Sequence, residues 1–262
     1  MTVKISIVTV AKNAEATIAD TLRSVAGQSH EAVEHILVDG ASTDRTMDIV
    51  QREGGHLAQV VSEPDQGLYD AMNKGIALAK GQVVGTLNAD DVYAHKNVLA
   101  KVATIFAQPD IQACFADLVY VQREDLGRVV RYWQSQAFTP GLFARGWIPA
   151  HPTFFVRRDV YEELGGFDLR YRLQSDFELM MRFLEIHTIK STYVPEVWVC
   201  MRMGGATNNS LINMYKGNME SFRACRRHGI RVGPWFFVSK FAMRIPQFFR
   251  RPESIVSTGE CR

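Results

Sequence analysis

The sequence contains no run of about 18 consecutive apolar residues, so it predicts no helix that spans a membrane. Its start, Met1–Asn13, holds a single lysine and only a short apolar stretch, Ile5–Ala11. That stretch is too short and wrongly flanked for a secretory signal peptide, and it is typical of a buried strand. We therefore expect a cytoplasmic protein.

Cysteine is also scarce, because the 262 residues include only four and none are spaced as CxxC. This spacing predicts neither a zinc site nor a disulfide framework, and reduced thiols are the simpler expectation. The 9 prolines and 19 glycines exclude collagen-like and low-complexity chains. Hydrophobic residues at 47% and charged residues at 22% exclude a disordered chain. The length fits one large domain, or one domain with an appendage.

The net charge of +2 is small but unevenly distributed. From Phe222 onward, nine lysine and arginine residues stand against two glutamates, which leaves the preceding chain mildly acidic. Nucleic acid is not an expected partner, because no recognised binding motif accompanies these arginines.

The basic tail is also aromatic. Its segment Pro234–Pro252 predicts a helix kinked at Pro246. Such a segment can lie on an anionic bilayer surface as a peripheral membrane contact. Packing onto the rest of the protein or onto a second subunit is the alternative, and the sequence leaves both open. The apolar residues near one face of this helix are Trp235, Val238, Ala242, Ile245 and Phe249.

Strand-like apolar runs alternate with helical patterns from Lys4 to Asn88. Such alternation implies right-handed crossovers and a mainly parallel sheet with helices on both faces. Polar residues follow three of the predicted strands, and ligands of such sheets bind beyond the carboxyl ends of strands. These polar segments are Thr9–Asn13, Asp39–Asp44 and Asn88–Asp91. The predicted strands are Lys4–Val10, His35–Asp39, Gln59–Ser62 and Gln82–Asn88, and the predicted helices are Ala14–Ala26, Thr43–Glu53 with Ser42 as its cap, and Leu68–Lys80.

The pattern changes after a predicted helix at Asn97–Phe106. Runs at Gln112–Val121 and Arg128–Trp133 flank a turn and predict an antiparallel element. The whole pattern predicts an α/β fold: a mainly parallel twisted sheet flanked by helices, a small antiparallel element and a helical C-terminal extension. The later predicted elements are a helix at Ser175–Ile186 with Ser175 and Glu178 in capping-box spacing, strands at Ile189–Val194 and Val197–Met203, and a helix at Asn208–His228.

An acidic motif, Asn88-Ala89-Asp90-Asp91, stands at the end of an apolar strand. Two adjacent carboxylates repel each other unless a cation joins them, and oxygen ligands on a short loop suit Mg²⁺ or Mn²⁺. The alternative is ordinary turn chemistry, because Asn and Asp favour loops. After an earlier strand, Asp39 offers a carboxylate that can accept the N–H of a nucleobase.

Several segments together carry a family resemblance. They are TVAKN (Thr9–Asn13), VDGxSxD (Val38–Asp44), EPDxGLYDAMNKGI (Glu63–Ile76), AxG (Ala79–Gly81), LNADD (Leu87–Asp91), HPTFF (His151–Phe155), GGFD (Gly165–Asp168) and SDFELMMR (Ser175–Arg182). In order and spacing this set resembles the inverting family-2 glycosyltransferases of GT-A type, which assemble bacterial polysaccharides and glycoconjugates. The resemblance implies a GT-A-like domain at 1–205, with a nucleotide-sugar-binding half at 1–91 and an acceptor-side half at 92–205, followed by a helical extension at 206–262.

The resemblance also implies roles for residues of the donor side. Thr9, Ala11 and Asn13 would line the nucleoside pocket, and Asp39 would contact the base. Asn73, Asn88 and Ala89 would lie at the donor. Asn88 stands where the family's Asp-X-Asp motif has its first carboxylate, and an amide can still contact the ribose. Asp90 would bind Mn²⁺ or Mg²⁺, with Asp91 as its neighbour or a second ligand.

On the acceptor side the resemblance implies that Asp176 is the general base. A carboxylate beside a helix N-terminus is held ionised and oriented, and it can take the proton of an acceptor hydroxyl. The alternative is that Asp176 only complements the helix dipole. His151 would border the acceptor, and Arg202 would reach phosphates, although either side chain can instead be structural.

The expected function is therefore metal-dependent, inverting transfer of a sugar from a nucleotide diphosphate sugar, with UDP as the expected nucleotide, to a saccharide or lipid-linked hydroxyl. A nucleotidyltransferase would share the sheet and the metal but needs a glycine-rich basic loop after the first strand, and Thr9–Glu15 has no glycine. A non-catalytic nucleotide-sugar-binding protein is the other alternative, against which the presence of Asp90 and Asp176 speaks. The expected location is the cytoplasm, at the inner face of the cell membrane if the tail binds lipid.

Overall fold

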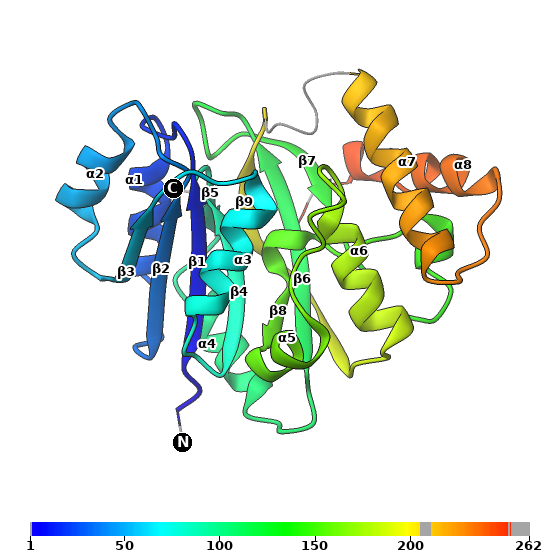
Figure 1. Ribbon diagram of the computed structural model, residues 1–262, viewed down its shortest axis with the longest axis horizontal. Helices are drawn as coiled ribbons and strands as arrows, with labels where there is room; N and C mark the ends of the chain where they lie inside the picture. The colour runs from blue at the N-terminus through cyan, green and yellow to red at the C-terminus, as the bar shows by residue number, and fades with distance from the viewer. Residues whose placement is uncertain (1, 205–210, 251, 253–262) are drawn as a thin grey trace.

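One twisted sheet forms the centre of the molecule (Figure 1). The computed structural model describes residues 2–204, 211–250 and 252. In these ranges the sheet has nine strands in the order β3-β2-β1-β4-β8-β6-β9-β5, and β7 pairs with β6. Strands β1 (Ile5–Ala11), β2 (Val33–Asp39), β3 (Leu57–Ser62) and β4 (Val83–Asn88) run parallel to one another. The parallel sheet predicted for the first half is confirmed.

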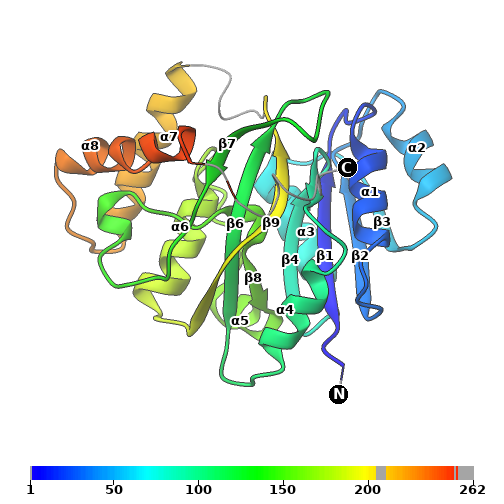
Figure 2. The same cartoon turned by 180° about the vertical axis from the view of Figure 1, so that it is seen from behind.

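Helices cover both faces of this parallel part, as the sequence predicts (Figures 1 and 2). Side chains alternate along a strand, so Val8 of β1 packs with Met72 on one face while Ile7 packs with Leu99 on the other. At Gly75 an added Cβ would lie 2.2 Å from Val8 Cγ1, so glycine allows its helix to approach the sheet closely. Helices α1 (Ile18–Ala26), α2 (Thr46–Glu53) and α4 (Val98–Phe106) lie on one face and α3 (Leu68–Leu78) on the other.

The second half of the sheet is mixed. Its strands are β5 (Asp91–Tyr93), β6 (Ala113–Val121), β7 (Val129–Trp133), β8 (Phe155–Arg157) and β9 (Ser191–Arg202). Strands β6 and β7 form the predicted antiparallel element, and β8 is antiparallel to both β4 and β6. The prediction of two separate late strands is wrong, because β9 is continuous. Its register on β6 skips Pro195 and Glu196, and this irregularity accommodates a proline that has no N–H to pair.

Helix α6 (Ser175–Met181) carries the predicted base and follows the shorter helix α5 (Arg158–Leu164). It continues into a π-helical turn at Arg182–Ile186. The predicted capping box is wrong: Ser175 Oγ donates to the carbonyl oxygen of Asp168 at 3.0 Å. Glu178 accepts a hydrogen bond from Arg182 Nε at 3.0 Å and lies 2.8 Å from the ring of His228. Both side chains therefore attach the helix to neighbouring segments.

The C-terminal helices pack beside α6, away from β1–β4 (Figure 1). They are α7 (Leu211–Arg227), α8 (Trp235–Ala242) and a 3-10 turn at Ile245–Phe248. Phe236 of α8 is buried and meets Phe177 edge to face at 6.3 Å. The prediction of one kinked helix over this segment is wrong, because α8 ends at Ala242 and Pro246 lies in the separate 3-10 turn. Among the described residues, no helix is long and apolar enough to cross a bilayer.

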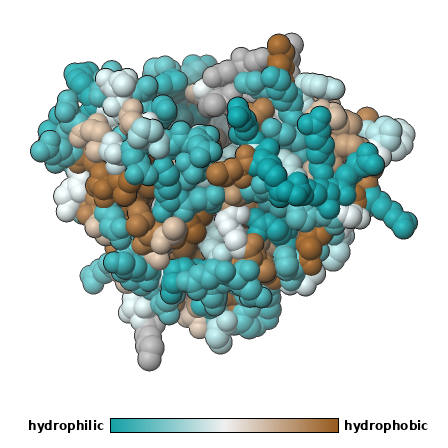
Figure 3. Space-filling model, viewed as in Figure 1, coloured by the Kyte–Doolittle hydropathy of each residue, from teal (hydrophilic) through white to brown (hydrophobic). Residues whose placement is uncertain are grey.

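Two further features concern the thiols and the surface. Cys114 and Cys225 are buried free thiols, in agreement with the expectation of reduced thiols for these two residues. Hydrophilic side chains cover most of the face seen in Figure 3, with apolar side chains visible in separate groups between them.

Candidate functional site

The carboxyl ends of β1, β2 and β4 meet at one edge of the sheet. The register pairs Ala11 with Asp39 and Val10 with Asn88, so the three predicted polar segments begin side by side. We call this region the acidic edge, defined by Asp39 and the loop 88–91. The predicted convergence of these segments is confirmed.

Asp39 is fully buried at the acidic edge, and its carboxylate is held by two serines. It accepts hydrogen bonds from the Ser42 N–H at 3.0 Å, from Ser42 Oγ at 2.5 Å and from Ser62 Oγ at 2.7 Å. Ser42 therefore does not cap the following helix, which begins only at Thr46. These contacts fix the orientation of the Asp39 carboxylate from inside the protein.

Asn13 joins the loops after β1 and β2. Its N–H donates to Ser42 Oγ at 2.8 Å, and its side-chain Oδ1 accepts from the Thr43 N–H at 2.9 Å. Asn13 has φ +50°, a left-handed conformation that asparagine tolerates better than most residues. Ala11, at the end of β1, accepts the Gly40 N–H at 2.8 Å through its carbonyl. These two residues lie where the sequence predicted them.

Thr9 lies inside the sheet and not at its edge. Its side chain is fully buried, and Thr9 Oγ1 lies 2.9 Å from His35 Nε2. His35 Nδ1 in turn lies 2.9 Å from His56 Nε2. Burial, with the neighbouring His56, lowers the pKa of His35 to about 3, so this imidazole is neutral. A pocket-lining role for the Thr9 side chain does not fit this geometry.

The loop 88–91 concentrates negative charge away from water. Asn88 Nδ2 donates to Asp91 Oδ2 at 3.1 Å. Burial raises the pKa of Asp90, and burial together with the nearby Asp90 charge raises the pKa of Asp91 well above its usual range. Ala89, between them, is buried. A bound cation would favour the charged forms of both carboxylates.

Two oxygens of this loop fit a hard cation. Asn88 Oδ1 and Asp91 Oδ1 are buried and have no hydrogen-bond partner, and the Asp90 carboxylate stands between them in sequence. Oxygen donors of this kind suit Mg²⁺ or Mn²⁺. Within residues 2–204, 211–250 and 252, no group of three or more His, Cys, Asp or Glu residues is arranged to hold a metal. A metal here would therefore need oxygen ligands from its substrate.

Arg202 lies behind the acidic loop and does not face a ligand. Its side chain is 5% exposed, and its Nη1 donates to the Asp90 carbonyl oxygen at 2.9 Å. The Nη2 atom contacts Asp20 Oδ2 at 2.5 Å, and Nε donates to the Arg123 carbonyl oxygen at 3.1 Å. The guanidinium therefore holds the backbone of the loop, and its charge partly offsets the raised pKa of both aspartates.

Asn73 of α3 is a structural clamp. Its Nδ2 donates to the Phe167 carbonyl oxygen and its Oδ1 accepts from the Phe167 N–H, each at 2.8 Å. At Gly166 an added Cβ would lie 2.3 Å from Asn73 Oδ1, so this contact needs glycine there. Because both amide groups are used, Asn73 links α3 to the loop before α6 and offers little to a donor.

Asp176 lies half-buried at the start of α6. Its Oδ1 accepts hydrogen bonds from Tyr69 Oη at 3.0 Å and from the Phe177 N–H at 2.9 Å. Burial, and then the neighbouring Asp176 charge, raise the pKa of Tyr69, so its hydroxyl stays a donor. Tyr69 is not among the residues predicted for the site, although it stands in the motif at Glu63–Ile76.

His151 belongs to the same region as Asp176. Its ring packs edge-on against Phe167 with centroids 5.7 Å apart, and its Nε2 lies 3.3 Å from Thr86 Oγ1. Burial lowers the pKa of His151, and the charge of Asp176 only partly opposes this shift. The structure therefore brings a neutral His151 close to Asp176.

Strand pairing connects the acidic loop with Tyr120 of β6. The strand register forms a row from Asp91 on β5 through Met201 on β9 and Tyr120 on β6 to Arg131 on β7. Burial raises the pKa of Tyr120, the charge of Arg131 opposes this, and the charges of both Asp91 and Asp176 add to it. The negative charges of Asp91 and Asp176 therefore both raise the pKa of the Tyr120 hydroxyl.

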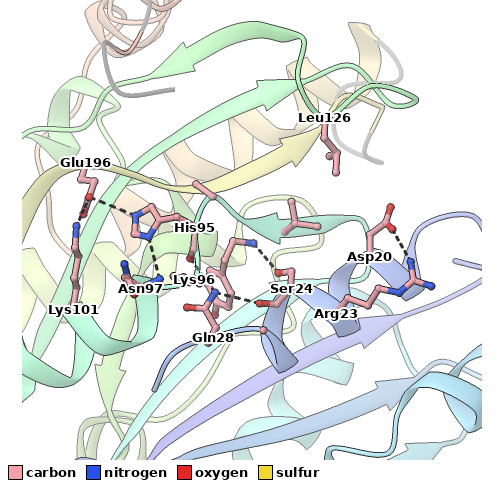
Figure 4. A pocket seen from close by; sticks show the side chains of 14 residues that line it. Asp20, Arg23, Ser24, Gln28, His95, Lys96, Asn97, Lys101, Leu126 and Glu196 are labelled. Atoms are coloured by element: carbon pink, nitrogen blue, oxygen red, sulfur yellow. Dashed lines mark hydrogen bonds and ion pairs between the residues drawn. The ribbon is translucent and has the colours of Figure 1, made fainter. Parts of the chain in front are cut away.

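A further cavity lies away from these residues. It has a volume of about 750 Å³, lies between α1, β5 and the start of α4, and contains none of the predicted site residues (Figure 4). Its charged side chains pair with one another: Arg23 lies 3.6 Å from Asp20, and Glu196 accepts contacts from Lys101 and His95. Its own charged groups are therefore largely paired, in contrast to the unpartnered oxygens Asn88 Oδ1 and Asp91 Oδ1 of the acidic edge.

Comparisons with known proteins point to one family. Residues 6–165 match the family model described as Glycosyl transferase family 2. A Mycobacterium bovis protein named PGL/p-HBAD biosynthesis glycosyltransferase is 30% identical over 232 residues, which cover 87% of each chain. A putative glycosyltransferase, EpsE of Bacillus subtilis, is 26% identical over 92% of this chain and 88% of its own.

Solved structures with the same fold bind nucleotide sugars. S. aureus TarS 1–349 in complex with UDP-GlcNAc has a TM-score of 0.67 at 15% identity, over 97% of this chain and 77% of that one. The mannosyltransferase PcManGT from Pyrobaculum calidifontis, in complex with GDP-Man and Mn²⁺, has a TM-score of 0.65 at 20% identity, over 92% of this chain and 69% of that one. The predicted GT-A-type fold is confirmed.

Proposed function

The chain belongs to glycosyl transferase family 2, and we propose that it transfers one sugar from a nucleotide diphosphate sugar to a hydroxyl of a saccharide or lipid-linked acceptor, with inversion at the anomeric carbon. The observation that carries this proposal is that the carboxyl ends of β1, β2 and β4 meet at the acidic edge, where Asn88 Oδ1 and Asp91 Oδ1 are buried without a hydrogen-bond partner among the described residues. The Mycobacterium bovis relative is named for glycoconjugate biosynthesis, which supports an acceptor of this class.

The donor binds the half formed by residues 1–91. Asp39 accepts the imide N–H of uracil, so UDP is the nucleotide we propose. Ser42 and Ser62 hold the carboxylate in place for this contact. Asn13 and the backbone of Ala11 form the neighbouring wall, and Asn88 reaches the ribose.

Asn88, Asp90 and Asp91 are the residues that would hold Mn²⁺ or Mg²⁺. The ion would neutralise negative charge on the departing diphosphate. Asp90 is the less buried of the two carboxylates, and we therefore assign it as the main ligand of the ion. Arg202 contributes by holding the loop backbone, so that the carboxylates keep their positions when the ligand leaves.

Asp176 takes the proton of the acceptor hydroxyl. Tyr69 and the Phe177 N–H both donate to Oδ1, and among the described residues no hydrogen bond reaches Oδ2. That oxygen is open to the acceptor. Attack from the side opposite the diphosphate inverts the anomeric carbon. The acceptor side is formed by residues 92–205, with His151 as its neutral polar border.

The C-terminal helices rest on an anionic bilayer surface in this proposal. Trp235, Phe241 and Phe249 are 78%, 69% and 82% exposed. Residues 222–250 contain seven lysine and arginine residues and no acidic residue, which complements anionic lipid. A peripheral contact of this kind would bring the enzyme to the membrane surface, where a lipid-linked acceptor would be found.

The test is to incubate the protein with UDP-sugars, Mn²⁺ and saccharide or lipid extracts, and to measure UDP release and the anomeric configuration of the product by NMR. We expect acceptor-dependent UDP release and an inverted product. A raised melting temperature with UDP-sugars but no UDP release with any extract would favour the non-catalytic alternative and contradict the proposal. A product that retains the donor configuration would contradict inversion.

A further inference from the structure

A second cavity, of about 400 Å³, lies between β7, the segment that follows it and the C-terminal helix α8 with its 3-10 turn. We call it the C-terminal cavity. Among the described residues no aspartate or glutamate lines it, whereas three of its lining residues are Lys240, Arg244 and Arg250. A cavity whose charged lining residues are all cations favours an anion.

Two of these cations, Lys240 and Arg244, have no carboxylate partner among the described residues. Lys240 is 4% exposed, and its Nζ donates to Ser221 Oγ at 2.8 Å and to Gln174 Oε1 at 3.3 Å. The Arg244 guanidinium has no hydrogen bond or ion pair to any described residue. Burial, and then the charge of Arg244, lower the pKa of Lys240 to about 7. A bound anion would relieve the repulsion between these two cations.

The remaining walls suit an organic group attached to the anion. Trp133 and Trp147 line the cavity and offer flat apolar surfaces. Ser135 also lines it, and its buried Oγ has no hydrogen-bond partner. Asp117 lies behind this wall, where it accepts the Ser135 N–H at 2.7 Å and a hydrogen bond from Tyr132 Oη at 2.5 Å. Asp117 therefore fixes the backbone of Ser135 and the side chain of Tyr132, while the Ser135 hydroxyl remains unpaired beside the cavity.

The cavity adjoins the proposed base. Lys240 extends from it towards the start of α6, where its Nζ lies 5.1 Å from the centre of the Phe177 ring. The charge of Asp176, one residue earlier, raises the pKa of Lys240, which partly opposes the effect of burial. On its other side, α8 carries the exposed apolar residues described above. A ligand in the cavity therefore lies between the base and the exposed face of α8.

We propose that the C-terminal cavity binds the phosphate of an acceptor in which a phosphate is joined to an apolar chain. Arg244 supplies the main charge to the phosphate, Ser135 a hydroxyl, and the tryptophans contact the adjoining chain. This inference rests on the proposed function, since it identifies the chemical class of the acceptor. Arg244 is then a residue that determines specificity for the acceptor, although it lies outside the donor half.

The probe is geranyl phosphate, titrated against the protein while tryptophan fluorescence is recorded, with geraniol and inorganic phosphate titrated separately. We expect saturable quenching by geranyl phosphate and at least tenfold weaker binding of geraniol. Arg244→Gln should weaken geranyl phosphate binding about tenfold, whereas Arg244→Lys should retain most of it. Arg226→Gln, which changes an exposed arginine of α7 outside the cavity, is the matched control and should bind like the wild type.

Equal binding of geraniol and geranyl phosphate would overturn the proposal, as would unchanged binding in Arg244→Gln. Binding of inorganic phosphate as tight as that of geranyl phosphate would overturn the part assigned to the apolar chain. Donor binding is measured in parallel, as the shift in melting temperature with UDP and Mn²⁺. If UDP and Mn²⁺ do not raise the melting temperature of the wild type, that result counts against the proposed function alone. The titration of the cavity with geranyl phosphate does not depend on the donor.

Discussion

The acidic edge and the C-terminal helices differ in how their side chains are satisfied. On the donor side, Asp39 accepts three hydrogen bonds and the amide of Asn73 makes two. The buried oxygens Asn88 Oδ1 and Asp91 Oδ1, which have no hydrogen-bond partner among the described residues, are those that we assign to a cation. In the C-terminal helices, Trp235 and Phe241 are mostly exposed, and Arg244 pairs with no described residue. Side chains of the donor side are thus oriented by hydrogen bonds within the protein. Side chains of the C-terminal helices are exposed or unpaired and are suited to contact a ligand or a membrane. Changes at the edge should therefore alter chemistry and stability, and changes in the C-terminal helices should alter binding.

The largest effect is expected from Asp176→Asn. The amide cannot take the acceptor proton, so kcat for transfer should fall by roughly 10²–10⁴-fold. The dissociation constant of UDP, measured by calorimetry, should stay within about twofold because Asp176 does not touch the nucleotide in this proposal. Tyr69→Phe is the informative companion: loss of one hydrogen bond should lower kcat only about tenfold. A variant Asp176→Asn with more than a tenth of wild-type kcat would remove the residue from its role.

Asp90→Asn should lower Mn²⁺-stimulated transfer roughly 100-fold, equivalent to about 3 kcal/mol of lost stabilisation. The amide is a weaker ligand than a carboxylate for a hard cation. The measurement is the initial rate of UDP release as Mn²⁺ is titrated. Asp110→Asn, which changes an exposed aspartate paired with Lys190, is the control and should keep the wild-type metal response. An unchanged metal titration in Asp90→Asn would refute the assignment of this ligand.

Gly166→Ala tests how firmly the two halves are joined. Its Cβ would displace the Asn73 amide and break the paired contacts with Phe167, which should lower the free energy of unfolding by about 2 kcal/mol. Gly55→Ala is the matched control, because an added Cβ there meets nothing within 4 Å. The two variants are compared by urea unfolding followed by circular dichroism. Equal stability of the two would mean that the Asn73 clamp contributes little.

The smallest effect is expected at the membrane. The double variant Trp235→Ser/Phe241→Ser should sediment with vesicles of phosphatidylglycerol and phosphatidylcholine about tenfold less than the wild type, because two exposed aromatic side chains no longer insert. Val60→Ser/Leu169→Ser changes exposed apolar residues elsewhere and serves as the control. Sedimentation of the wild type should itself drop on pure phosphatidylcholine. If wild type and double variant sediment alike, the C-terminal face does not contact lipid.

Much of the fold follows from short-range patterns. The strand and helix periods between Lys4 and Asn88 depend on neighbouring residues only, and the observed elements there differ from the predicted ones mainly in their ends. The apolar face of Pro234–Pro252 was predicted in the same way, and its residues Trp235, Val238, Ile245 and Phe249 are exposed. These patterns are local, so a single sequence is enough to detect them.

The partners of individual polar side chains could not be predicted in this way. Ser42 stabilises Asp39 and Asn13 rather than a helix end, and Arg202 reaches Asp20, which lies 182 positions away. Thr9 has a polar side chain, but this side chain lies inside the sheet and contacts His35. Each outcome depends on which distant segment folds against the residue. The C-terminal cavity needs three such segments, which explains why no sequence motif marks it.

Helix α3 has a consequence for protein engineering. Within one turn, its Tyr69 reaches Asp176 and its Asn73 clamps Phe167, so a helix encoded in the first half positions groups encoded a hundred residues later. A chimera that exchanged one half for that of a homologous enzyme would separate these pairs. Hybrid enzymes of this type should therefore inherit α3 and the segment 165–177 from a single parent.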